Sequence, residues 1–325
     1  MDHFRKGNLS GAQVYQWLLD LRAHPHIPES GFAVSAIFRA RCGTDDDYYF
    51  AGVNVENMDH RLSTHGEEGA ISALVTALGK QAEIVEGWVM GAPRHIKPGD
   101  KDPSADAQVS CCGKCRQQIA GLASENTKIH YVTLNGEVTT TTVGKFLPDL
   151  FSFRQFIPDL VRDQGKGVAP VADDVQKKLL RRGPLTDKEI QSWLKSLEPV
   201  DYASKISQSV VLKLDNGFYV AGARVEEAAF IDISAVQAAI ANAASAFGTF
   251  TVENAWVYTC GRDEKKLPAG NFGTLPMSAL QVLLEFSKGE MLPLHYLGDG
   301  GLAVLKTLIS AAEIAPVSHR AFQKV

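Results

Sequence analysis

Tyr49-Phe50-Ala51-Gly52-Val53-Asn54-Val55-Glu56 recurs in the second half of the chain as Tyr219-Val220-Ala221-Gly222-Ala223-Arg224-Val225-Glu226. Both copies are rich in β-branched and aromatic residues, which indicates a strand, and Asp215-Asn216-Gly217 supplies a hairpin turn before the second copy. A solenoid needs about three or more short repeats. Two copies of a long unit therefore predict two similar domains.

The similarity extends on both sides of this strand. Near the start of each of the segments Leu9–Leu18 and Leu185–Leu194 lies a hydroxyl residue, Ser10 or Thr186, that can cap a helix. Each segment then carries a tryptophan and apolar residues at helical spacing. Further along, Trp88-Val89-Met90 matches Trp256-Val257-Tyr258. Because strands alternate with helices in each copy, we expect the α/β class with a mixed sheet.

Composition limits the kind of protein and its surroundings. The 325 residues are 45% hydrophobic and 22% charged, as in ordinary globular proteins, and the net charge of −4 disfavours a nucleic-acid binder. An odd, clustered set of five cysteines predicts a reducing compartment, so we expect the cytoplasm. We see neither a signal peptide nor an apolar stretch of roughly 18 residues, and expect no membrane association.

Two short motifs carry the chemistry of the chain: His65-Gly66-Glu67 and Cys112-Gly113-Lys114-Cys115. One imidazole and two thiolates offer three zinc ligands and leave a fourth position for water, which is the catalytic arrangement. A nearby glutamate that does not bind the metal can move protons. Together these residues predict zinc-dependent base deamination.

Each motif is expected at the start of a helix. An apolar-periodic run that begins at Ala70 predicts a helix starting near His65, and Cys112 and Cys115 would begin a second helix. Helix N-termini stabilise thiolates and other anions. Two helix starts that face each other would hold one metal ion.

The second copy loses this site. Its Ser234 aligns with His65, and Pro276 and Ala279 align with the two cysteines, so we expect it to keep the fold without the metal. Taken alone, a histidine is usually structural, and a Cys-x-x-Cys pair could be a redox pair or half of a structural zinc site. The joint pattern favours a catalytic zinc. The remaining cysteines are expected to have no role: Cys42, Cys111 and Cys260.

The chain resembles the cytidine deaminases, specifically the two-domain homodimeric type with an inactive C-terminal repeat. The resemblance rests on Gly52–Asn57, His65–Glu67 and Cys112–Gln117, with weaker similarity at Phe146–Phe151 and Tyr202–Lys205. It implies a duplicated three-layer α/β/α domain with a mixed sheet. It also implies hydrolysis of cytidine and 2′-deoxycytidine to uridine and 2′-deoxyuridine in pyrimidine salvage, by a homodimer in which the inactive half closes a neighbour's pocket.

The resemblance also implies roles for individual residues. One Zn²⁺ per chain would bind His65, Cys112 and Cys115, Glu67 would move protons, and Arg116 would hydrogen-bond a zinc thiolate. The residues implied to contact the substrate are Asn54 and Glu56 at the ribose hydroxyls, Phe32 and Gly66 beside the nucleoside, and Phe151, with Phe146, over the base. On a strand, Asn54 and Glu56 would point to the same face. The alternatives are an exposed polar edge for that pair and core packing for Phe32 and Phe151.

Three features depart from the family pattern. Gly66 replaces an alanine, and Cys111 stands where the family has a proline, which would fix φ before the first thiolate. A polar segment from Ala92 to Gln108 lengthens the chain between the two motifs. It could be a lid or a specificity element. The alternative is an inherited surface insertion, because the second half has a similar polar segment at Arg262–Gly273.

These departures keep other functions open. The alternatives are a deaminase of a different cytosine-like or modified nucleoside, or of cytosine in single-stranded nucleic acid, and a non-catalytic zinc-containing binding protein. A contact from Asn54 and Glu56 to the 3′-hydroxyl would leave no room for a following phosphate, and an intact Glu67 argues against a structural zinc.

Glycine and proline mark a linker at about 164–184, within which the basic run Lys177–Arg182 is expected to be a solvated helix face. The predicted division is an N-terminal helical segment at 1–27, a catalytic zinc domain at 28–163, a linker and helix at 164–195, and a degenerate domain at 196–325.

Overall fold

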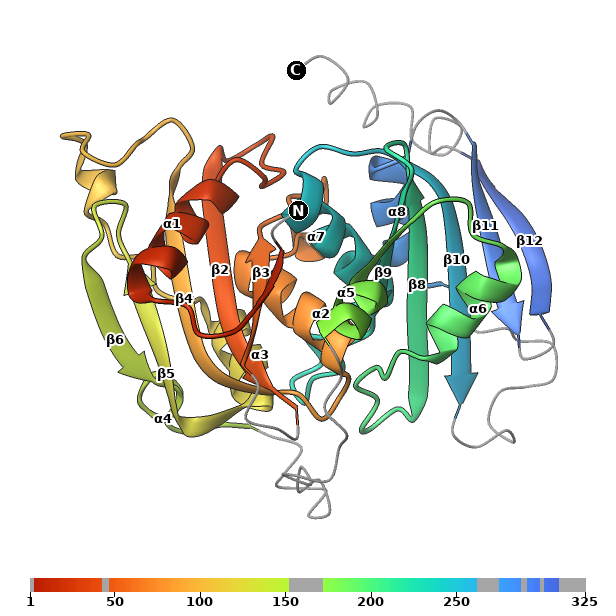
Figure 1. Ribbon diagram of the computed structural model, residues 1–325, viewed down its shortest axis with the longest axis horizontal. Coiled ribbons are helices and arrows are strands. Elements are labelled where there is room, and N and C mark those ends of the chain that lie inside the picture. Colours follow the sequence, from red (N-terminus) through yellow and green to blue (C-terminus); the bar gives the residue numbers. More distant parts are fainter. Residues whose placement is uncertain are drawn as a thin grey trace.

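The computed structural model describes residues 3–42, 47–151, 172–261, 275–287, 291–298 and 301–309, which form two six-stranded sheets (Figure 1). In spatial order the first sheet contains β1 (Phe4–Lys6), β3 (Tyr48–Val53), β2 (Phe32–Arg41), β4 (Glu83–Pro93), β5 (Ala123–Val132) and β6 (Val138–Thr142). The second contains β7 (Leu180–Arg182), β9 (Phe218–Ala223), β8 (Ile206–Leu214), β10 (Val252–Gly261), β11 (Met291–Gly298) and β12 (Gly301–Ile309).

The two sheets have the same strand order and the same directions. In the first, β4 and β5 run parallel and the other neighbours are antiparallel. In the second, β10 and β11 are the parallel pair. The structure thus confirms the predicted α/β class with mixed sheets, and the repeated strand order is the arrangement expected from an internal duplication.

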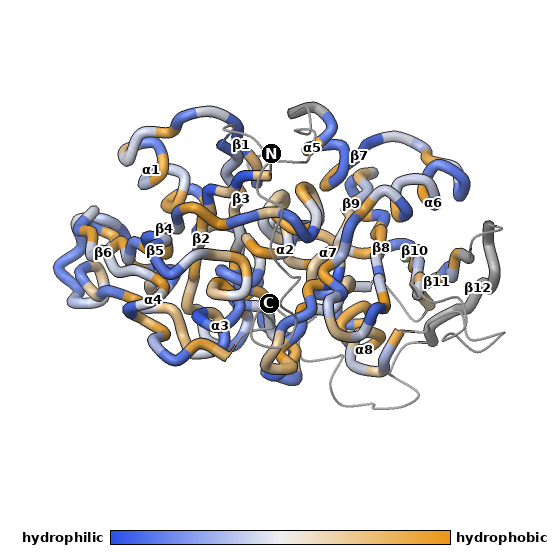
Figure 2. Tube along the Cα trace, turned by 90° about the horizontal axis from the view of Figure 1, so that it is seen from below, coloured by the Kyte–Doolittle hydropathy of each residue, from blue (hydrophilic) through white to orange (hydrophobic). Residues whose placement is uncertain are grey.

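Helices cover both faces of the strands. In Figure 2, α1 (Gly11–Leu21), α5 (Ala172–Leu179) and α6 (Asp187–Lys195) lie on one side, and α3 (Gly113–Leu122), α4 (Val143–Phe146) and α8 (Met277–Glu285) on the other. The helices α2 (Gly66–Leu78) and α7 (Ala235–Phe247) pack together in the middle of the molecule, between the sheets (Figure 1). None of the helices in these ranges has the length and apolar character that crossing a bilayer requires.

Local sequence explains where the outer helices begin. The Ser10 hydroxyl accepts from the N–H of Gln13 at α1, and the Thr186 hydroxyl accepts from the N–H of Glu189 at α6. In both cases the side chain at the third helical position bonds back to the cap residue, which completes a capping box. The hydroxyl caps predicted from the repeated segments are therefore confirmed.

The two halves share one core through reciprocal hydrogen bonds. The N–H of Val53, at the end of β3, donates to the Ser245 hydroxyl of α7 (3.2 Å), and the N–H of Ala223, at the end of β9, donates to the Thr76 hydroxyl of α2 (3.0 Å). All four residues are buried. Each half thus supplies a hydrogen-bond acceptor for a buried strand-end N–H of the other half. These two bonds link the sheets through α2 and α7.

The predicted linker is partly structured. Residues 152–171 lie outside the described part of the chain, but α5 begins at Ala172 and β7 joins the second sheet beside β9. The expectation of one solvated helix face for Lys177–Arg182 is wrong, because the helix ends at Leu179 and the last residues form β7. The Arg181 guanidinium packs 4.4 Å from the Trp193 ring centroid. The division into domains stays a prediction.

Gly52 lets β3 contact α2 directly, so replacing it with alanine should destabilise the fold. An added Cβ would lie 2.0 Å from the Ala70 nitrogen and 2.2 Å from the Gly66 oxygen, both backbone atoms. We expect Gly52→Ala to lower the free energy of unfolding by about 3 kcal/mol, measured by urea denaturation. Gly11→Ala is the control, because nothing lies within 4 Å of an added Cβ there. Equal stability of the two variants would contradict the close packing.

Candidate active site

The two chemical motifs lie at the N-termini of two helices, as predicted. His65 is the residue immediately before α2 and Cys112 the residue immediately before α3, and both have extended backbone conformations. Neither side chain caps the amides of its own helix. Both side chains are therefore available to a ligand.

The three predicted ligands converge. His65 Nδ1 lies 3.3 Å from the sulfur of Cys112 and 3.3 Å from that of Cys115, and the three ligand atoms all lie within 4.8 Å of one another. Cys115 is buried, His65 is half-buried and Cys112 is exposed. One imidazole nitrogen and two sulfurs are a donor set that zinc accepts. This cluster could bind a metal ion.

The charges within the cluster favour metal binding. Hydrogen bonds from Cys115 and from His65 lower the pKa of the Cys112 thiol to about 3. The hydrogen bond with Cys112 and burial raise the pKa of Cys115, and the hydrogen bond with Cys112 raises that of His65. One thiolate is therefore present at neutral pH, and the thiolate is the form of cysteine that binds metals.

Glu67 lies in the first turn of α2 and is only 4% exposed. Burial raises the pKa of its carboxyl group, against the opposing effects of its own backbone N–H and of His65. A raised pKa brings a carboxyl group closer to the pH at which general acid–base catalysis operates. The position and burial of Glu67 suit the predicted proton transfer.

Cys111 was expected to have no role, but it belongs to the surroundings of Glu67. It is 1% exposed, and its thiol lies against the Glu67 carboxylate and the Tyr131 hydroxyl. Burial raises the pKa of this thiol, so it stays neutral. In the sequence, this position stood out only because a cysteine replaces the proline of the family pattern. Only the folded chain shows which groups the thiol contacts.

Glu68 was not identified from the sequence, although it connects the two motifs. It is 2% exposed, and its carboxylate accepts from the His65 N–H (2.9 Å), from Gln118 Nε2 (2.8 Å) and from Lys114 Nζ (2.9 Å). The bond to His65 is half of a capping box, whose spacing was readable in the sequence. Glu68 therefore fixes the start of α2 relative to α3.

Glu68→Ala should weaken metal binding without removing a ligand. The substitution frees the His65 backbone and leaves Lys114 without its partner, so we expect metal affinity to fall by about 10- to 100-fold. Competition with a chromogenic chelator measures the effect. Glu253→Ala, which breaks an exposed ion pair with Lys213, is the control. Equal affinities of the two variants would show that Glu68 does not support the ligands.

Asn54 and Glu56 lie just beyond β3, which ends at Val53, so their placement on a strand was wrong. The Asn54 amide still faces β2: its Oδ1 accepts from the Val34 N–H (2.8 Å) and its Nδ2 donates to the Phe32 carbonyl (2.9 Å). This side chain holds the start of β2 in place.

Glu56 fastens the segment that precedes β2. Its Oε2 accepts from the N–H groups of Glu29 (3.0 Å) and Ser30 (3.2 Å). The alternative of an exposed polar edge is thus wrong, because both Asn54 and Glu56 bind main-chain groups between Glu29 and Val34. The structure brings this pair to the same segment as Phe32.

Gly66 touches this segment from α2. A Cβ on Gly66 would lie 2.9 Å from Val34 Cγ1, so an alanine here would need Val34 to move. Phe32 is half-buried, and its ring lies near Gly91, because a Cβ there would be 3.1 Å from Phe32 Cε1. The start of β2 and the start of α2 are therefore in direct contact at Gly66.

The aromatic residues after β6 surround α3. Phe151 is 46% exposed, and its carbonyl accepts from Gln117 Nε2 (2.6 Å). The Phe146 ring centroid lies 5.7 Å from the Arg116 guanidinium carbon. Arg116 donates to the carbonyls of Cys111 (2.8 Å) and Phe146 (3.3 Å), and its expected bond to a zinc thiolate stays a prediction. A role for Phe151 over the base stays a prediction.

The inserted segment Ala92–Gln108 is tied to the turn between β5 and β6. Asn135 in that turn accepts from the Gly99 N–H (2.8 Å) and donates to the Asp106 carboxylate (2.7 Å). The similar segment at residues 262–273 lies outside the described part of the chain. A lid or specificity role and a surface insertion both stay open.

Known proteins resemble part of this chain. A cytidine deaminase from Sporosarcina psychrophila is 28% identical over 131 residues, which cover 40% of this chain and 83% of the relative. One from Halalkalibacterium halodurans is 25% identical over 134 residues, covering 41% of this chain and 88% of the relative. This chain has cytidine deaminases as homologues. The predicted hydrolase of the cytidine deaminase type agrees with them.

Solved structures of the same kind also match. The crystal structure of cytidine deaminase from Burkholderia pseudomallei covers 44% of this chain and 100% of its own, at 22% identity and a TM-score of 0.35. That of the Mycobacterium leprae cytidine deaminase covers the same shares at 23% identity and a TM-score of 0.33. No family model matches the chain. The two relatives found by sequence match 40% and 41% of this chain over 83% and 88% of their own length, so each accounts for less than half of the chain.

Proposed function

We propose that the protein deaminates cytidine and 2′-deoxycytidine to uridine and 2′-deoxyuridine with the help of one zinc ion. One observation carries the proposal: His65, Cys112 and Cys115 converge within 4.8 Å, beside the buried carboxyl group of Glu67, in a chain whose homologues are cytidine deaminases. A structural zinc has no use for such a carboxyl group, which argues against a non-catalytic binding protein.

The donor set decides which metal fits. His65, Cys112 and Cys115 would hold zinc, since sulfur and imidazole ligands suit it and leave one position open for catalysis. A zinc ion bound there supplies Lewis acidity, which lowers the pKa of water to about 7. The remaining chemistry belongs to side chains of the protein.

Glu67 performs the proton transfers in the proposed reaction. Its carboxylate takes a proton from the attacking water and gives it to N3 of the cytosine ring while the water oxygen bonds to C4. It then moves a second proton from the new hydroxyl group to the amino group. The bond between C4 and the amino nitrogen breaks, ammonia leaves and uridine remains. The raised pKa of Glu67 suits both directions of transfer.

The ribose would lie against the segment that Asn54 and Glu56 fasten to the main chain. An amide and a carboxylate together can donate to and accept from sugar hydroxyls. Phe32 starts β2 beside them and offers an apolar surface. Because such contacts use the hydroxyl that a polynucleotide links to phosphate, a free nucleoside in pyrimidine salvage is the preferred substrate.

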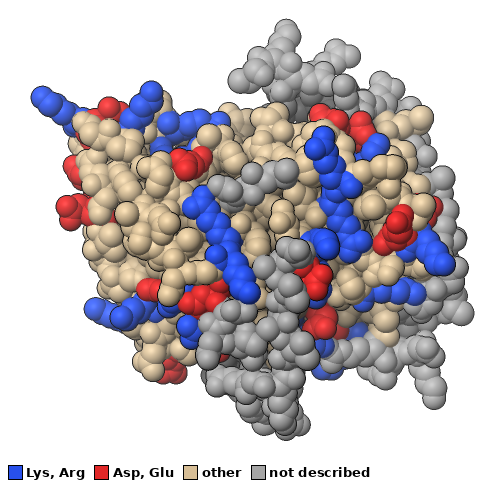
Figure 3. Space-filling view, viewed as in Figure 1, with Lys and Arg blue, Asp and Glu red and all other residues tan. Residues whose placement is uncertain are grey.

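The charge pattern favours the same choice. On the face shown in Figure 3, basic and acidic side chains are interspersed, without one large basic area in the part drawn in colour. Binding of single-stranded nucleic acid usually uses a positively charged groove. A modified or cytosine-like nucleoside stays the second candidate, because Gly66 and Cys111 change the surroundings of the reacting group.

Three further proposals complete this function. The second half keeps the fold without the metal ligands and serves as a partner surface, two chains form a homodimer, and the enzyme acts in the cytoplasm. The five cysteines are all free, which supports a reducing compartment. Light scattering tests the dimer, and a fully active monomer would overturn that part of the proposal.

A substrate panel tests the function. Purified protein with its zinc content measured is incubated with cytidine, deoxycytidine, cytosine and a short C-containing oligonucleotide, and loss of cytosine absorbance is followed. We expect turnover of the two nucleosides. Turnover of the oligonucleotide alone would favour the nucleic-acid alternative, and bound zinc without turnover of any substrate would indicate a non-catalytic protein.

A further inference from the structure

A cavity of about 490 Å³ is lined by residues of both halves and includes, in the second half, the positions that correspond to metal ligands of the first. Its wall includes Ser234 and Pro276, which align with His65 and Cys112. These residues immediately precede α7 and α8, as the metal ligands precede α2 and α3. The degenerate copy has lost the ligands but has kept a space of the size in which proteins bind small molecules.

The frame around this cavity repeats that of the first half. Glu226 accepts from the N–H groups of Ala203 (2.7 Å) and Ser204 (3.0 Å), as Glu56 does in its own copy. Arg224 occupies the position that Asn54 has in the first half. Like Asn54, it donates to a main-chain carbonyl of a neighbouring strand, here that of Ile206 in β8 (3.3 Å). The backbone arrangement is thus retained, while an amide in the wall has become a guanidinium.

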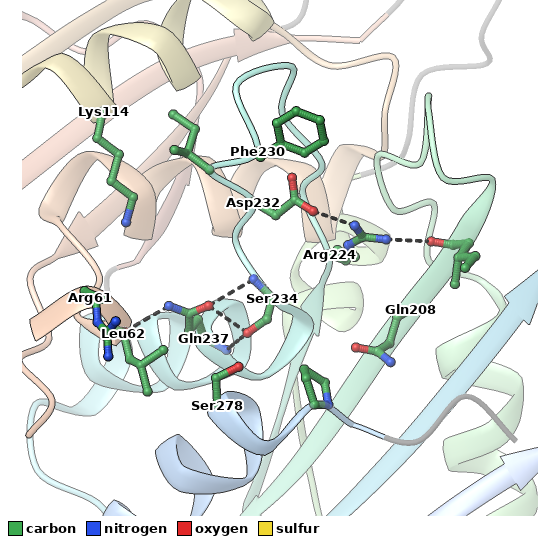
Figure 4. Close-up of a pocket in the computed structure, with 13 residues that line it drawn as sticks. Arg61, Leu62, Lys114, Gln208, Arg224, Phe230, Asp232, Ser234, Gln237 and Ser278 are labelled. Atoms are coloured by element: carbon green, nitrogen blue, oxygen red, sulfur yellow. Dashed lines mark hydrogen bonds and ion pairs between the residues drawn. The ribbon is translucent and has the colours of Figure 1, made fainter. Parts of the chain in front are cut away.

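The wall of the cavity is mostly basic where it is charged. Arg61, Lys114 and Arg224 line it, and Asp232, which pairs with Arg224, is the acidic residue among the lining side chains (Figure 4). Figure 4 shows Lys114 and Arg61 on one side and Arg224 on the other. This excess of basic groups, in a chain with a net charge of −4, favours an anionic ligand.

The two basic residues on one side keep donors for such a ligand. Lys114 contacts both oxygens of Glu68 (2.9 and 3.0 Å), and an ammonium group has three donors. Arg61 bonds Asp59 through Nε and Nη2, which leaves its other N–H groups. Neither Glu68 nor Asp59 lines the cavity. An anion between Arg61 and Lys114 would therefore meet donors and no lining carboxylate on that side.

An aromatic ring stands at the same cavity. Phe230 is 96% exposed and has a φ of 57°, in the left-handed region that non-glycine residues rarely adopt. Such a conformation costs free energy and is found preferentially at functional sites. The exposed ring offers a flat face on which a base can stack.

We propose that this cavity binds a nucleoside monophosphate as a second, non-catalytic site. The phosphate lies between Arg61 and Lys114, and the base stacks on Phe230. The choice of a nucleoside rests on the proposed function, since the cavity is the degenerate counterpart of a nucleoside site. The bound nucleotide is not deaminated there, because the metal ligands and the counterpart of Glu67 are absent from this copy.

Calorimetric titration of the zinc-loaded full chain with uridine 5′-monophosphate tests the proposal, because this nucleotide has no amino group to lose. We expect one binding event per chain that saturating cytidine does not displace. Arg61→Ala removes one donor residue and should weaken nucleotide binding by about tenfold. Removing the stacking surface should weaken it in Phe230→Ala, also by about tenfold. Lys213→Ala is the control, a basic residue whose exposed ion pair lies outside the cavity wall.

Several outcomes would overturn the proposal. They are no binding at millimolar nucleotide, displacement by cytidine, inorganic phosphate binding as tightly as the nucleotide, and wild-type affinity in both Arg61→Ala and Phe230→Ala. A changed oligomeric state of Phe230→Ala with unchanged affinity would assign the ring to an interface instead. The titration needs no turnover, so failure of the deaminase assay would be recognised separately.

Discussion

Glu67→Ala should abolish most turnover of cytidine while the protein keeps its zinc. Glu67 is buried beside the ligand cluster but is not one of its three ligands. General acid–base catalysis contributes about 10²- to 10⁴-fold, and Glu67 is proposed to act in several successive proton transfers, so we expect a loss of about 10⁴-fold in kcat. Steady-state kinetics and metal analysis of the same sample measure both quantities.

Two further variants separate proton transfer from packing. Glu67→Gln keeps the shape of the side chain and should be nearly as inactive as Glu67→Ala, because an amide does not take up the proton. Glu125→Ala, at an exposed position of β5, should behave as wild type. Near-normal kcat in Glu67→Gln would show that the carboxyl group only fills space.

Cys115→Ala should remove both the metal and the activity. Cys115 is the fully buried member of the cluster, and its sulfur lies 3.3 Å from His65 Nδ1. Loss of Lewis acidity worth several kcal/mol should lower kcat/KM by at least about 10³-fold. Elemental analysis should find a zinc content far below one per chain.

Chelation provides an independent route to the same state. Dialysis of the wild-type protein against a chelator should stop turnover, and added zinc should restore it. Cys260→Ala is the matched control, because the Cys260 thiol donates to the neighbouring Gly261 carbonyl and lies outside the cluster. A Cys115→Ala protein with full activity would remove the metal from the proposed mechanism.

The consequences of Cys111 and Glu68 follow from chain segments that are distant in sequence. Cys111 reaches Glu67 because α3 starts beside α2, and Glu68 reaches Gln118 and Lys114 for the same reason. In the sequence, Cys111 is an extra cysteine and Glu68 a second acidic residue of a first turn. Neither pattern indicates which partner the side chain will have, since that depends on how two helices approach.

The error at Asn54 and Glu56 has a related cause. The β-branched and aromatic residues correctly indicate an extended chain, but β3 ends at Val53. Beyond it, Val55 pairs with His26 and Thr64 in isolated bridges, so partners distant in the sequence replace the strand ladder. Local propensity contains no information about these contacts, and element ends are decided by such partners.

The internal repeat stays a prediction, but the amino-acid sequence is enough to predict the mixed α/β architecture, the helix starts and the three side chains that converge there. Each of these depends on local spacing: capping residues, periodic apolar positions and short ligand motifs are read within one segment. The folded chain alone reveals that α2 and α7 join the halves, that Cys111 contacts Glu67, and that a basic cavity faces Phe230 in the second copy. These features arise where segments distant in the sequence meet, and their free energy depends on distances that no local pattern encodes.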